Sequence, residues 1–144
     1  MNILKHNRAA WDKQVEQKNK WTLPVSSAEI AKAKKGKAKI VLTPKKNVPA
    51  DWYGNVYDKD ILCLAAGGGQ QGPLFAAMGA KVTVFDNSPK QLQKDVFVAN
   101  RESLKINIVQ GDMKDLSCFK DKSFDLIFHP VSNCFVPDIA PVWK

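Results

Sequence analysis

The stretch ILCLAAGGGQQGPLFAAMGAKVTVFDNSPKQL, residues 61–92, decides the fold. It contains two short apolar runs, residues 61–64 and 82–85, which are typical of buried strands. A glycine-rich turn and a short helical segment separate the two runs, and Asp86 follows the second. A strand, a glycine-rich turn, a helix and a second strand that ends in an acid form half of a nucleotide-binding βαβ unit.

The chain continues to alternate between strands and helices. Ser88, Pro89 and Gln91 have the spacing of a capped helix start, with Gln91 in the reciprocal position, and this helix is expected to end near Ser103. Residues 106–110 and 124–128 are the predicted third and fourth strands. This alternation predicts an α/β fold with a doubly wound, parallel, Rossmann-like sheet of which strands 1–4 are present.

The N-terminal part differs from the rest. Residues 1–50 are predicted to form a helical cap or extension, and residues 51–144 the ligand-binding sheet domain. A first helix is expected to reach about Lys20. Ser26 and Glu29 have the spacing of a capping box, which predicts the start of a second helix.

The chain ends soon after its fourth predicted strand. Residues 137–139 have the pattern of a further helix start, close to the last residue, Lys144. We therefore expect a fragment of a longer protein, truncated before the C-terminal strands of the sheet. Its fourth strand would be an apolar edge and a candidate surface for oligomer formation.

The composition places the chain among ordinary globular proteins. Its 144 residues are enough for one core, and it is 44% hydrophobic and 25% charged. It has no apolar run of membrane-spanning length and no signal-peptide segment, so we expect a cytoplasmic protein without a membrane partner. Cys63, Cys118 and Cys134 form no CxxC pair. They are expected to be small buried residues rather than a metal or redox site.

The net charge of +8 is concentrated in the N-terminal part. Residues 1–60 contain 13 Lys and Arg against 6 Asp and Glu, whereas residues 61–144 contain 9 against 8. The run KAKKGKAK, residues 32–39, is compatible with a nucleic acid or another polyanion as partner. The favoured interpretation is a solvated helix end, because no aromatic residue interrupts these lysines and cations complement the helix dipole.

The glycines allow more than one nucleotide. Gly67, Gly69 and Gly72 match G-x-G-x-x-G, as in dinucleotide sites. The residues after Gly72 are not the Lys and Ser/Thr of a Walker-type phosphate loop, which excludes that motif. A dinucleotide turn that includes Gly72 leaves only residues 73–78 for the helix. A turn that ends at Gly69 leaves a longer helix and needs no diphosphate.

Two acids follow neighbouring strands. Asp86 is placed to accept hydrogen bonds from a ribose diol, or else to cap the following helix. Asp112 is placed to accept from an exocyclic amino group while the Met113 amide donates to the ring; alternatively it belongs to an ordinary turn. Small residues at 65–69 let a ligand approach bare backbone. These features describe an adenosine site, and alone they do not separate S-adenosylmethionine from NAD.

Residues 61–139 resemble the front half of a class I S-adenosylmethionine-dependent methyltransferase. ILCLAAGGG corresponds to the family's glycine loop, and VTVFDNSPKQL to the acid of strand two and its helix. IVQGDMKDL resembles the third motif, and FDLIFHPVSNCFVPDI the fourth strand and its loop. The opening NRAAWDKQVEQKNKWTLPVS is similar to the N-terminal cap of bacterial members that act on small molecules.

The resemblance implies S-adenosylmethionine as cofactor, bound at the strand tips. Cys63 stands where members often have an acid, and Ala65 replaces the first loop glycine. The amino group of the ligand is therefore expected to be bound by backbone carbonyls, by Gln70 or by the N-terminal segment. The predicted cofactor-binding residues are Ala65, Ala66, Gly67, Gly69, Gln70, Asp86, Asn87, Asp112, Met113 and His129.

The implied reaction transfers a methyl group to a nucleophile. His129 is the one candidate general base, and its alternative role is that of a wall residue beside Pro130. The fourth motif, HPVSNCF, differs from the N/D-P-P-Y/F pattern of methyltransferases that act on nucleobase nitrogens. Asn7, Trp11 and Trp21 form either a lid over the cofactor or simple N-terminal packing.

Three functions remain open at this point. The favoured one is a methyltransferase for a small-molecule acceptor, without a metal. The second is an RNA-directed methyltransferase that binds phosphates through the basic N-terminal segment. The third is a non-catalytic or dinucleotide-binding relative with the same fold.

Overall fold

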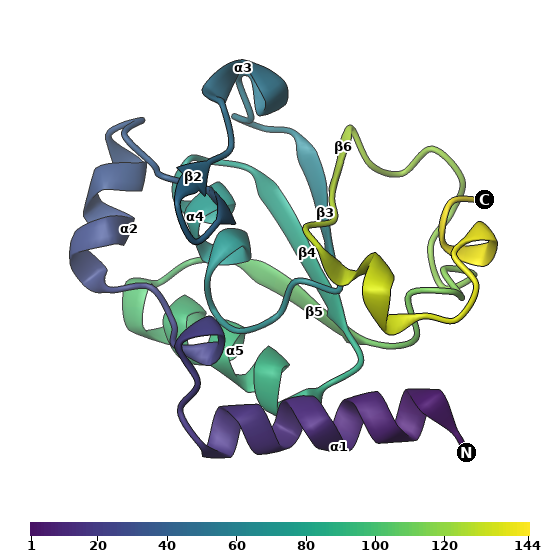
Figure 1. Cartoon of the computed structure of the whole chain (residues 1–144). Coiled ribbons are helices and arrows are strands. Elements are labelled where there is room, and N and C mark those ends of the chain that lie inside the picture. Colours follow the sequence, from purple (N-terminus) through teal and green to yellow (C-terminus); the bar gives the residue numbers. More distant parts are fainter.

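The computed structural model describes residues 1–144, and a four-stranded parallel sheet lies at its centre (Figure 1). The strand order is β5-β4-β3-β6, and all three neighbouring pairs are parallel. This arrangement confirms the predicted Rossmann-like α/β sheet. The strands are β3 (Asp60–Leu64), β4 (Lys81–Asp86), β5 (Ile106–Gln110) and β6 (Leu126–Phe128).

Strand β3 is buried on both faces. Its residues from Ile61 to Leu64 are at most 2% exposed, as expected for the continuous apolar run of a central parallel strand. One face of the sheet packs against the helices α4 (Gln71–Ala77) and α5 (Pro89–Glu102). The other face is covered by non-helical chain, including the segment 111–125 and the C-terminal residues.

Helix α4 begins after Gln70, so the preceding turn ends at Gly69, as one of the two interpretations predicted. Gly72 lies in the first turn of this helix. A Cβ atom there would be 2.6 Å from Cγ2 of Val84, so glycine lets the helix approach β4 closely. Gly79 follows the helix with a φ of +92°, a conformation that favours glycine.

Helix α5 is capped from two directions. Ser88 Oγ accepts a hydrogen bond from the Gln91 amide at 3.1 Å, as predicted. The predicted reciprocal contact of Gln91 is wrong: the Ser88 amide donates to Asp86 Oδ1 at 2.8 Å instead. Asp12, from the N-terminal helix, accepts from Ser88 Oγ at 2.6 Å. The start of α5 therefore connects the strand tip to the N-terminal region.

The N-terminal region surrounds one side of the sheet. Helix α1 has no buried residue and lies across the lower edge of the molecule in Figure 1. It ends at Glu16, before the predicted Lys20, because Lys18 adopts a positive φ of 53°. The elements of this region are α1 (Ile3–Glu16), η1 (Lys20–Thr22), α2 (Ser27–Lys34), β1 (Val41–Thr43), β2 (Lys46–Asn47) and α3 (Ala50–Tyr53).

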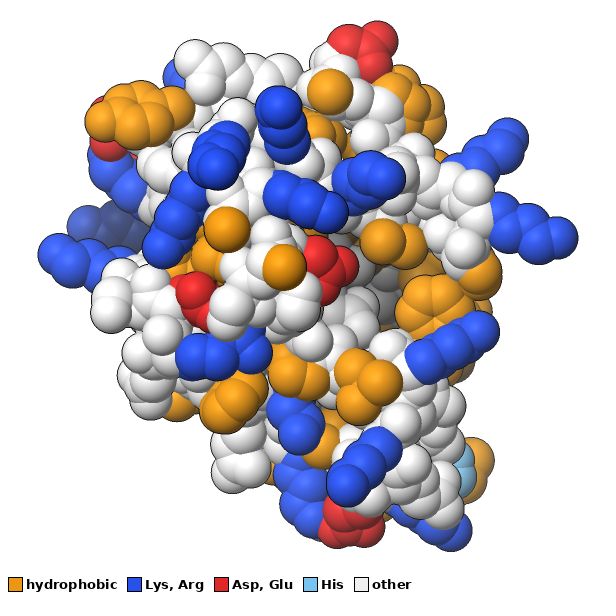
Figure 2. Space-filling model, turned by 90° about the vertical axis from the view of Figure 1, so that its left-hand side faces the viewer, with side chains coloured by type: hydrophobic (Ala, Val, Ile, Leu, Met, Phe, Trp, Pro, Cys, Tyr) orange, Lys and Arg blue, Asp and Glu red, His pale blue; other side chains and the backbone are white.

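The lysines of the basic run are exposed around the end of α2, and so are two further lysines in the β1–β2 hairpin. Figure 2 shows that Lys and Arg side chains are spread over this side of the molecule, with fewer acidic side chains among them. None of these lysines takes part in an ion pair. They are Lys32, Lys34, Lys35, Lys37, Lys39, Lys45 and Lys46.

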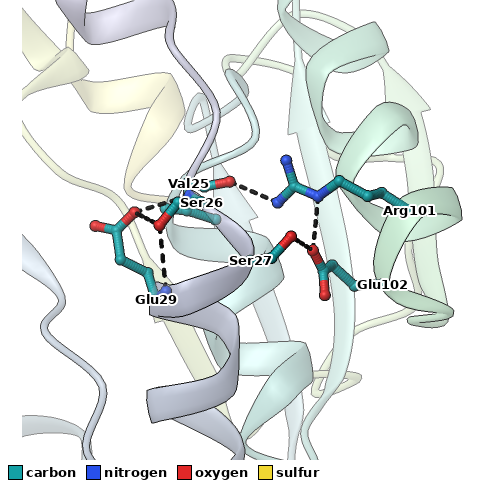
Figure 3. A network of polar contacts seen from close by, with 6 residues as sticks. All are labelled: Val25, Ser26, Ser27, Glu29, Arg101 and Glu102. Carbon is teal, nitrogen blue, oxygen red and sulfur yellow. Dashed lines mark hydrogen bonds and ion pairs between the residues drawn. The ribbon is translucent and has the colours of Figure 1, made fainter.

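Polar contacts join the start of α2 to the end of α5 (Figure 3). Ser26 and Glu29 form the predicted capping box, with the Ser26 amide donating to Glu29 Oε2 at 2.8 Å. Ser27 Oγ donates to Glu102 Oε1 at 2.5 Å. The Arg101 guanidinium donates to the backbone carbonyl oxygen that precedes Ser26, at 2.7 Å. These contacts fix the N-terminal region on the sheet domain.

The segment after β6 contains two short 3-10 turns, η2 (Ser132–Phe135) and η3 (Ala140–Val142). The predicted helix start at residues 137–139 is therefore wrong. Val142 returns to the sheet and is 8% exposed in a cluster with Leu62 and Phe85. Val142 and apolar side chains of the segment 111–125 therefore cover this face in place of the expected helix.

The cysteines differ in their surroundings. Cys63 is fully buried, as predicted, and burial raises the pKa of its thiol. Cys118 and Cys134 are exposed, so the prediction is wrong for them.

No cluster of His, Cys, Asp and Glu side chains could hold a metal ion. None of the helices combines the length and apolar content that a membrane crossing requires.

Exchanges at two turn residues test how tightly the glycine turn is packed. Gly69 has a φ of +70°, and a Cβ atom there would be 2.7 Å from the carbonyl oxygen of Lys94. We expect Gly69→Ala to lower the free energy of unfolding by about 1–3 kcal/mol, because conformation and contact both oppose a side chain. Ala65→Gly is the matched exchange, since Ala65 already has a φ of +49°.

Urea titrations of the two variants measure the effect. Ala65→Gly should change the free energy of unfolding by less than about 1 kcal/mol, because relief of strain offsets the added chain entropy. An unchanged urea midpoint for Gly69→Ala would contradict the close packing of the turn.

Candidate functional site

The carboxyl ends of β3, β4 and β5 lie side by side at one edge of the sheet. Leu64 pairs with Phe85, and Asp86 pairs with Gln110. The glycine turn, Asp86 and the Gly111-Asp112 turn therefore emerge at the same edge. Open α/β sheets bind their ligands at this edge.

A cavity of about 830 Å³ lies here, a size typical of small-molecule sites. The N-terminal helix, the β1–β2 hairpin and the segment 130–137 also contribute to its walls. Gly69 and His129 are the two predicted residues that do not line it. The predicted residues that do are Ala65, Ala66, Gly67, Gln70, Asp86, Asn87, Asp112 and Met113.

The Asp86 carboxylate is fixed by two backbone amides and also lines the cavity. Oδ2 accepts from the Gly67 amide at 3.0 Å, and Oδ1 accepts from the Ser88 amide at 2.8 Å. Burial raises the pKa of Asp86, and the amides of Ser88 and Gly67 oppose this increase. A carboxylate has about four acceptor positions, so Asp86 caps α5 and still has lone pairs for a ligand.

Asp112 follows β5 and faces the same cavity as Asp86. Its Oδ1 accepts from the Lys114 amide at 3.0 Å, which is the ordinary turn contact that the sequence also allowed. The Lys114 ammonium is 3.9 Å from Oδ2. The structure brings the two predicted acids together, and contact of either with a ligand stays a prediction.

The glycines of the turn are required mainly by packing. A Cβ atom at Gly67 would be 2.9 Å from Cβ of Gln91 and 3.2 Å from Asp86 Oδ2. The backbone therefore passes directly beside the carboxylate. Gly69 is placed differently from the prediction: it packs against Lys94 and Pro24 and does not line the cavity.

Gln70 and Asn87 use their side-chain amides inside the protein. Gln70 Nε2 donates to the Leu23 carbonyl oxygen at 2.9 Å. Asn87 Nδ2 donates to the Leu4 carbonyl oxygen at 2.9 Å, and its Oδ1 accepts from Arg8 Nε at 3.0 Å. Both residues line the cavity, but their amides hold the N-terminal region against the strand tips.

His129 lies outside the cavity lining, which does not support its predicted contact with the cofactor. Its Nδ1 is 2.9 Å from the Leu64 carbonyl oxygen, and its Nε2 is 2.6 Å from Asn133 Oδ1. Because a carbonyl oxygen only accepts, Nδ1 carries a proton. Both ring nitrogens are engaged within the protein, so the structure favours the alternative of a packed residue beside Pro130 over the general base.

Two residues of α5 were not predicted as part of the site. Gln91 lines the cavity, and its buried Oε1 has no hydrogen-bond partner. Asp95 is fully buried; its Oδ2 accepts from the Gly68 amide at 3.0 Å, and its Oδ1 has no partner. The sequence did contain a signal that Asp95 is buried: its helical spacing places it between Leu92 and Val98 on the apolar side of the helix.

The N-terminal aromatic residues help to enclose the cavity. Trp11 and Trp21 line it together with Asn7. Asn7 Nδ2 donates to the Phe135 carbonyl oxygen at 2.7 Å, and the Trp11 ring meets the Phe135 ring edge-on with centroids 5.5 Å apart. Helix α1 therefore reaches from the tip of β4 to η2, so it both packs on the domain and covers the site.

Comparisons with known proteins identify the family of the chain. The family described as "Methyltransferase domain" matches residues 62–144. A Bacillus subtilis (strain 168) protein named "Uncharacterized methyltransferase YbaJ" is 54% identical over 142 residues. The match covers 99% of this chain and 56% of that protein, so the chain spans just over half of the relative's length.

Solved structures share the fold at lower identity. A Methanococcus maripaludis protein assigned as an S-adenosyl-L-methionine-dependent methyltransferase has a TM-score of 0.60 at 16% identity, covering 99% of this chain and 57% of its own. A structure described by the conversion of a disulfide bond into a thioacetal group in echinomycin biosynthesis has a TM-score of 0.54 at 18% identity. That match covers 83% of this chain and 46% of the other. At these identities the likeness concerns the fold alone.

The buried Asp95 predicts a pH-dependent stability. Burial raises its pKa from the ordinary 3.8 to about 7. Between these values the folded chain keeps a proton that the unfolded chain has lost, so this stabilisation is full below pH 4 and is lost as the pH rises through 7. The free energy of unfolding should fall by about 2–4 kcal/mol across this range through Asp95 alone.

The variant Asp95→Asn isolates this contribution. Urea titrations at pH 4 to 8 should show that the wild-type stability, measured relative to the variant, declines with pH. Asp121→Asn, which changes an exposed acid, is the control and should keep the wild-type profile. Parallel profiles for wild type and Asp95→Asn would show that Asp95 titrates normally.

Proposed function

This chain belongs to the class I S-adenosylmethionine-dependent methyltransferases, and on that premise we propose that it transfers a methyl group from S-adenosylmethionine to a small-molecule acceptor. One observation carries the proposal. Acids from two neighbouring strand tips, Asp86 and Asp112, face one cavity together with the bare backbone at Gly67. The activity of the whole protein is part of the proposal, because the chain spans about half of its relative.

The residues at the strand tips fit the adenosyl part of this cofactor. No side chain separates the turn from Asp86, since a Cβ atom at Gly67 would crowd the carboxylate. Asp86 is the proposed acceptor for the ribose hydroxyls and Asp112 for the exocyclic amino group, with the Met113 amide facing the ring. The unpartnered Gln91 Oε1 is a further acceptor beside the turn.

The two departures from the family motif have structural consequences. Cys63 is fully buried and cannot replace the missing acid as a ligand contact. Ala65 keeps a positive φ, so the turn retains the conformation that a glycine would have. The Ala65 carbonyl oxygen already accepts from Ser132 Oγ at 2.8 Å. We therefore propose that the ligand's amino group is held by carbonyls further along the turn, at Ala66 or Gly67.

The chain's own residues align and enclose the reactants in the proposed mechanism. S-adenosylmethionine, when bound, supplies a methyl group on a positively charged sulfur: the acceptor's lone pair forms the new bond to the methyl carbon, and the sulfur keeps the electrons of the broken bond. Asp86 and Asp112 are each held by backbone amides, which suits binding better than proton transfer. Alignment and exclusion of water then provide the rate enhancement, and a proton lost by the nucleophile passes to water.

Residues 1–50 are proposed to act as the cap of this site and residues 51–144 as its binding domain. Asn87 and Gln70 attach the cap at two points, close to Leu4 and Leu23. Three free cysteines are compatible with a reducing compartment, so we propose the cytoplasm as the location.

An RNA substrate is the second candidate, and the exposed lysines favour it. Seven lysines around the end of α2 and the hairpin have no ion-pair partner. Residues 41–44 of the same region also line the cavity. A phosphate backbone on this surface would therefore pass near the site entrance.

Cofactor binding tests the proposed function directly. We expect isothermal titration calorimetry to detect S-adenosylmethionine and no comparable binding of NADH. Asp86→Asn should weaken S-adenosylmethionine binding about 10–100-fold, the cost of about 1.5–3 kcal/mol for a charge-assisted hydrogen bond. Asp121→Asn changes an exposed acid away from the cavity and should bind like the wild type. Tight NADH binding without a response to S-adenosylmethionine would refute the proposal.

Salt dependence separates the small-molecule acceptor from RNA. For a small-molecule enzyme, a labelled single-stranded RNA should bind weakly, and changing Lys34, Lys35 and Lys37 to Gln should leave S-adenosylmethionine binding unchanged. Fluorescence anisotropy measures the RNA affinity at roughly 50 to 200 mM salt, because phosphate contacts weaken strongly over this range. A steep loss of tight binding over this range, abolished by the triple variant, would favour the RNA-directed enzyme.

A further inference from the structure

The cavity has two walls of different chemistry. The strand tips and the glycine turn form the wall proposed for the cofactor. The second wall consists of the lining residues from segments 1–11, 41–44 and 130–137, called here the uncharged wall. None of its residues has a charged side chain, although one residue in four of the whole chain is charged. The terminal ammonium of Met1 is the one charged group that these residues carry.

The absence of charge on this wall is not a property of its segments. Lys5 and Arg8 belong to the same helix as the lining residues, and Lys45 directly follows the lining residue Pro44. None of these three cations lines the cavity. The fold therefore turns the basic side chains of the N-terminal region away from the cavity.

The polar side chains of the uncharged wall already have partners within the protein. Asn7 donates to the Phe135 carbonyl oxygen, and Ser132 donates to that of Ala65. A charged ligand group placed against this wall would lose its water without gaining an oppositely charged side chain, which is unfavourable. The polar residues with internal partners are Asn2, Asn7, Thr43, Ser132 and Cys134.

Apolar side chains of this wall keep a large exposed area. Ile3, Val41 and Phe135 are 37%, 39% and 37% exposed. Trp11 and Phe135 add an aromatic corner. An apolar ligand would remove this area from water, which is the main favourable contribution to binding at such a surface.

We propose that the uncharged wall is the acceptor subsite and that the methyl acceptor is a neutral, largely apolar small molecule. This inference rests on the proposed function and names its substrate class. Both walls belong to one cavity, so the acceptor and the cofactor would bind side by side in it. A phosphorylated or strongly charged acceptor would find no complementary side chain on its side of the cavity.

The neutral fluorophore N-phenyl-1-naphthylamine tests the subsite, because its emission increases in apolar surroundings. We expect the full chain to bind it, and Val41→Lys to weaken this binding at least tenfold. Val96→Lys is the matched control: Val96 is 40% exposed, as Val41 is 39%, but it lies on α5 outside the cavity lining. This control should stay within twofold of the wild type.

A second variant keeps the test valid if Val41→Lys does not fold. Ile3→Lys changes another partly exposed residue of the uncharged wall, which lies on α1 rather than on the hairpin. It should also weaken binding of the probe at least tenfold. Circular dichroism confirms that each variant is folded. Equal probe affinity in wild type and both folded wall variants would overturn the proposal. So would stronger binding of the anionic 1-anilinonaphthalene-8-sulfonate when that binding is also lost in Val41→Lys.

Calorimetry with S-adenosylmethionine distinguishes the two possible failures. The wall variants should keep the wild-type cofactor affinity, since they change only residues of the uncharged wall. Retained cofactor binding with no wall-dependent probe binding would reject the apolar subsite and leave the methyltransferase proposal intact. Wall-dependent probe binding without any cofactor binding would reject the methyltransferase proposal, and with it the role of the wall as an acceptor subsite.

Discussion

The glycine turn lies directly against helix α5, and the geometry of the ligand-binding edge depends on that contact. A Cβ atom at Gly67 would be 2.9 Å from Cβ of Gln91, so no side chain can stand between turn and helix. The Gly68 amide completes the contact by donating to the buried Asp95. Because the turn is held from behind, its backbone stays beside Asp86 without a ligand, and little ordering is left for binding to impose.

The N-terminal helix is held in the opposite way, by polar contacts and not by burial. It has no buried residue, and its main contacts are Asp12 with Ser88 and Asn7 with the Phe135 carbonyl oxygen. Such hydrogen bonds contribute only about 0.5–1.5 kcal/mol each. Helix α1 therefore requires less free energy to move than the strand tips, which are fixed by the core.

The sequence predicted what depends on local pattern and missed what depends on distant partners. Strand periodicity and chain topology were sufficient to place Asp86 and Asp112 at one edge, because parallel strands must end together. The roles of Gln70, Asn87 and His129 were not predictable in this way. One hydrogen-bond partner of each of these residues lies 47 to 83 residues away along the chain and becomes a neighbour only after folding. Each was assigned to the ligand, and each is engaged with the protein itself.

The two walls of the cavity also depend on different parts of the sequence. The strand tips cannot change much, because the sheet, the turn and α5 fix them together. The uncharged wall comes from a surface helix, a hairpin and an irregular segment, none of which the sheet requires for its register. Substitutions there can alter the shape and polarity of one wall while the other keeps its geometry. If the two walls bind as proposed, the fold separates recognition of the acceptor from recognition of the cofactor, and acceptor specificity can vary without loss of the cofactor site.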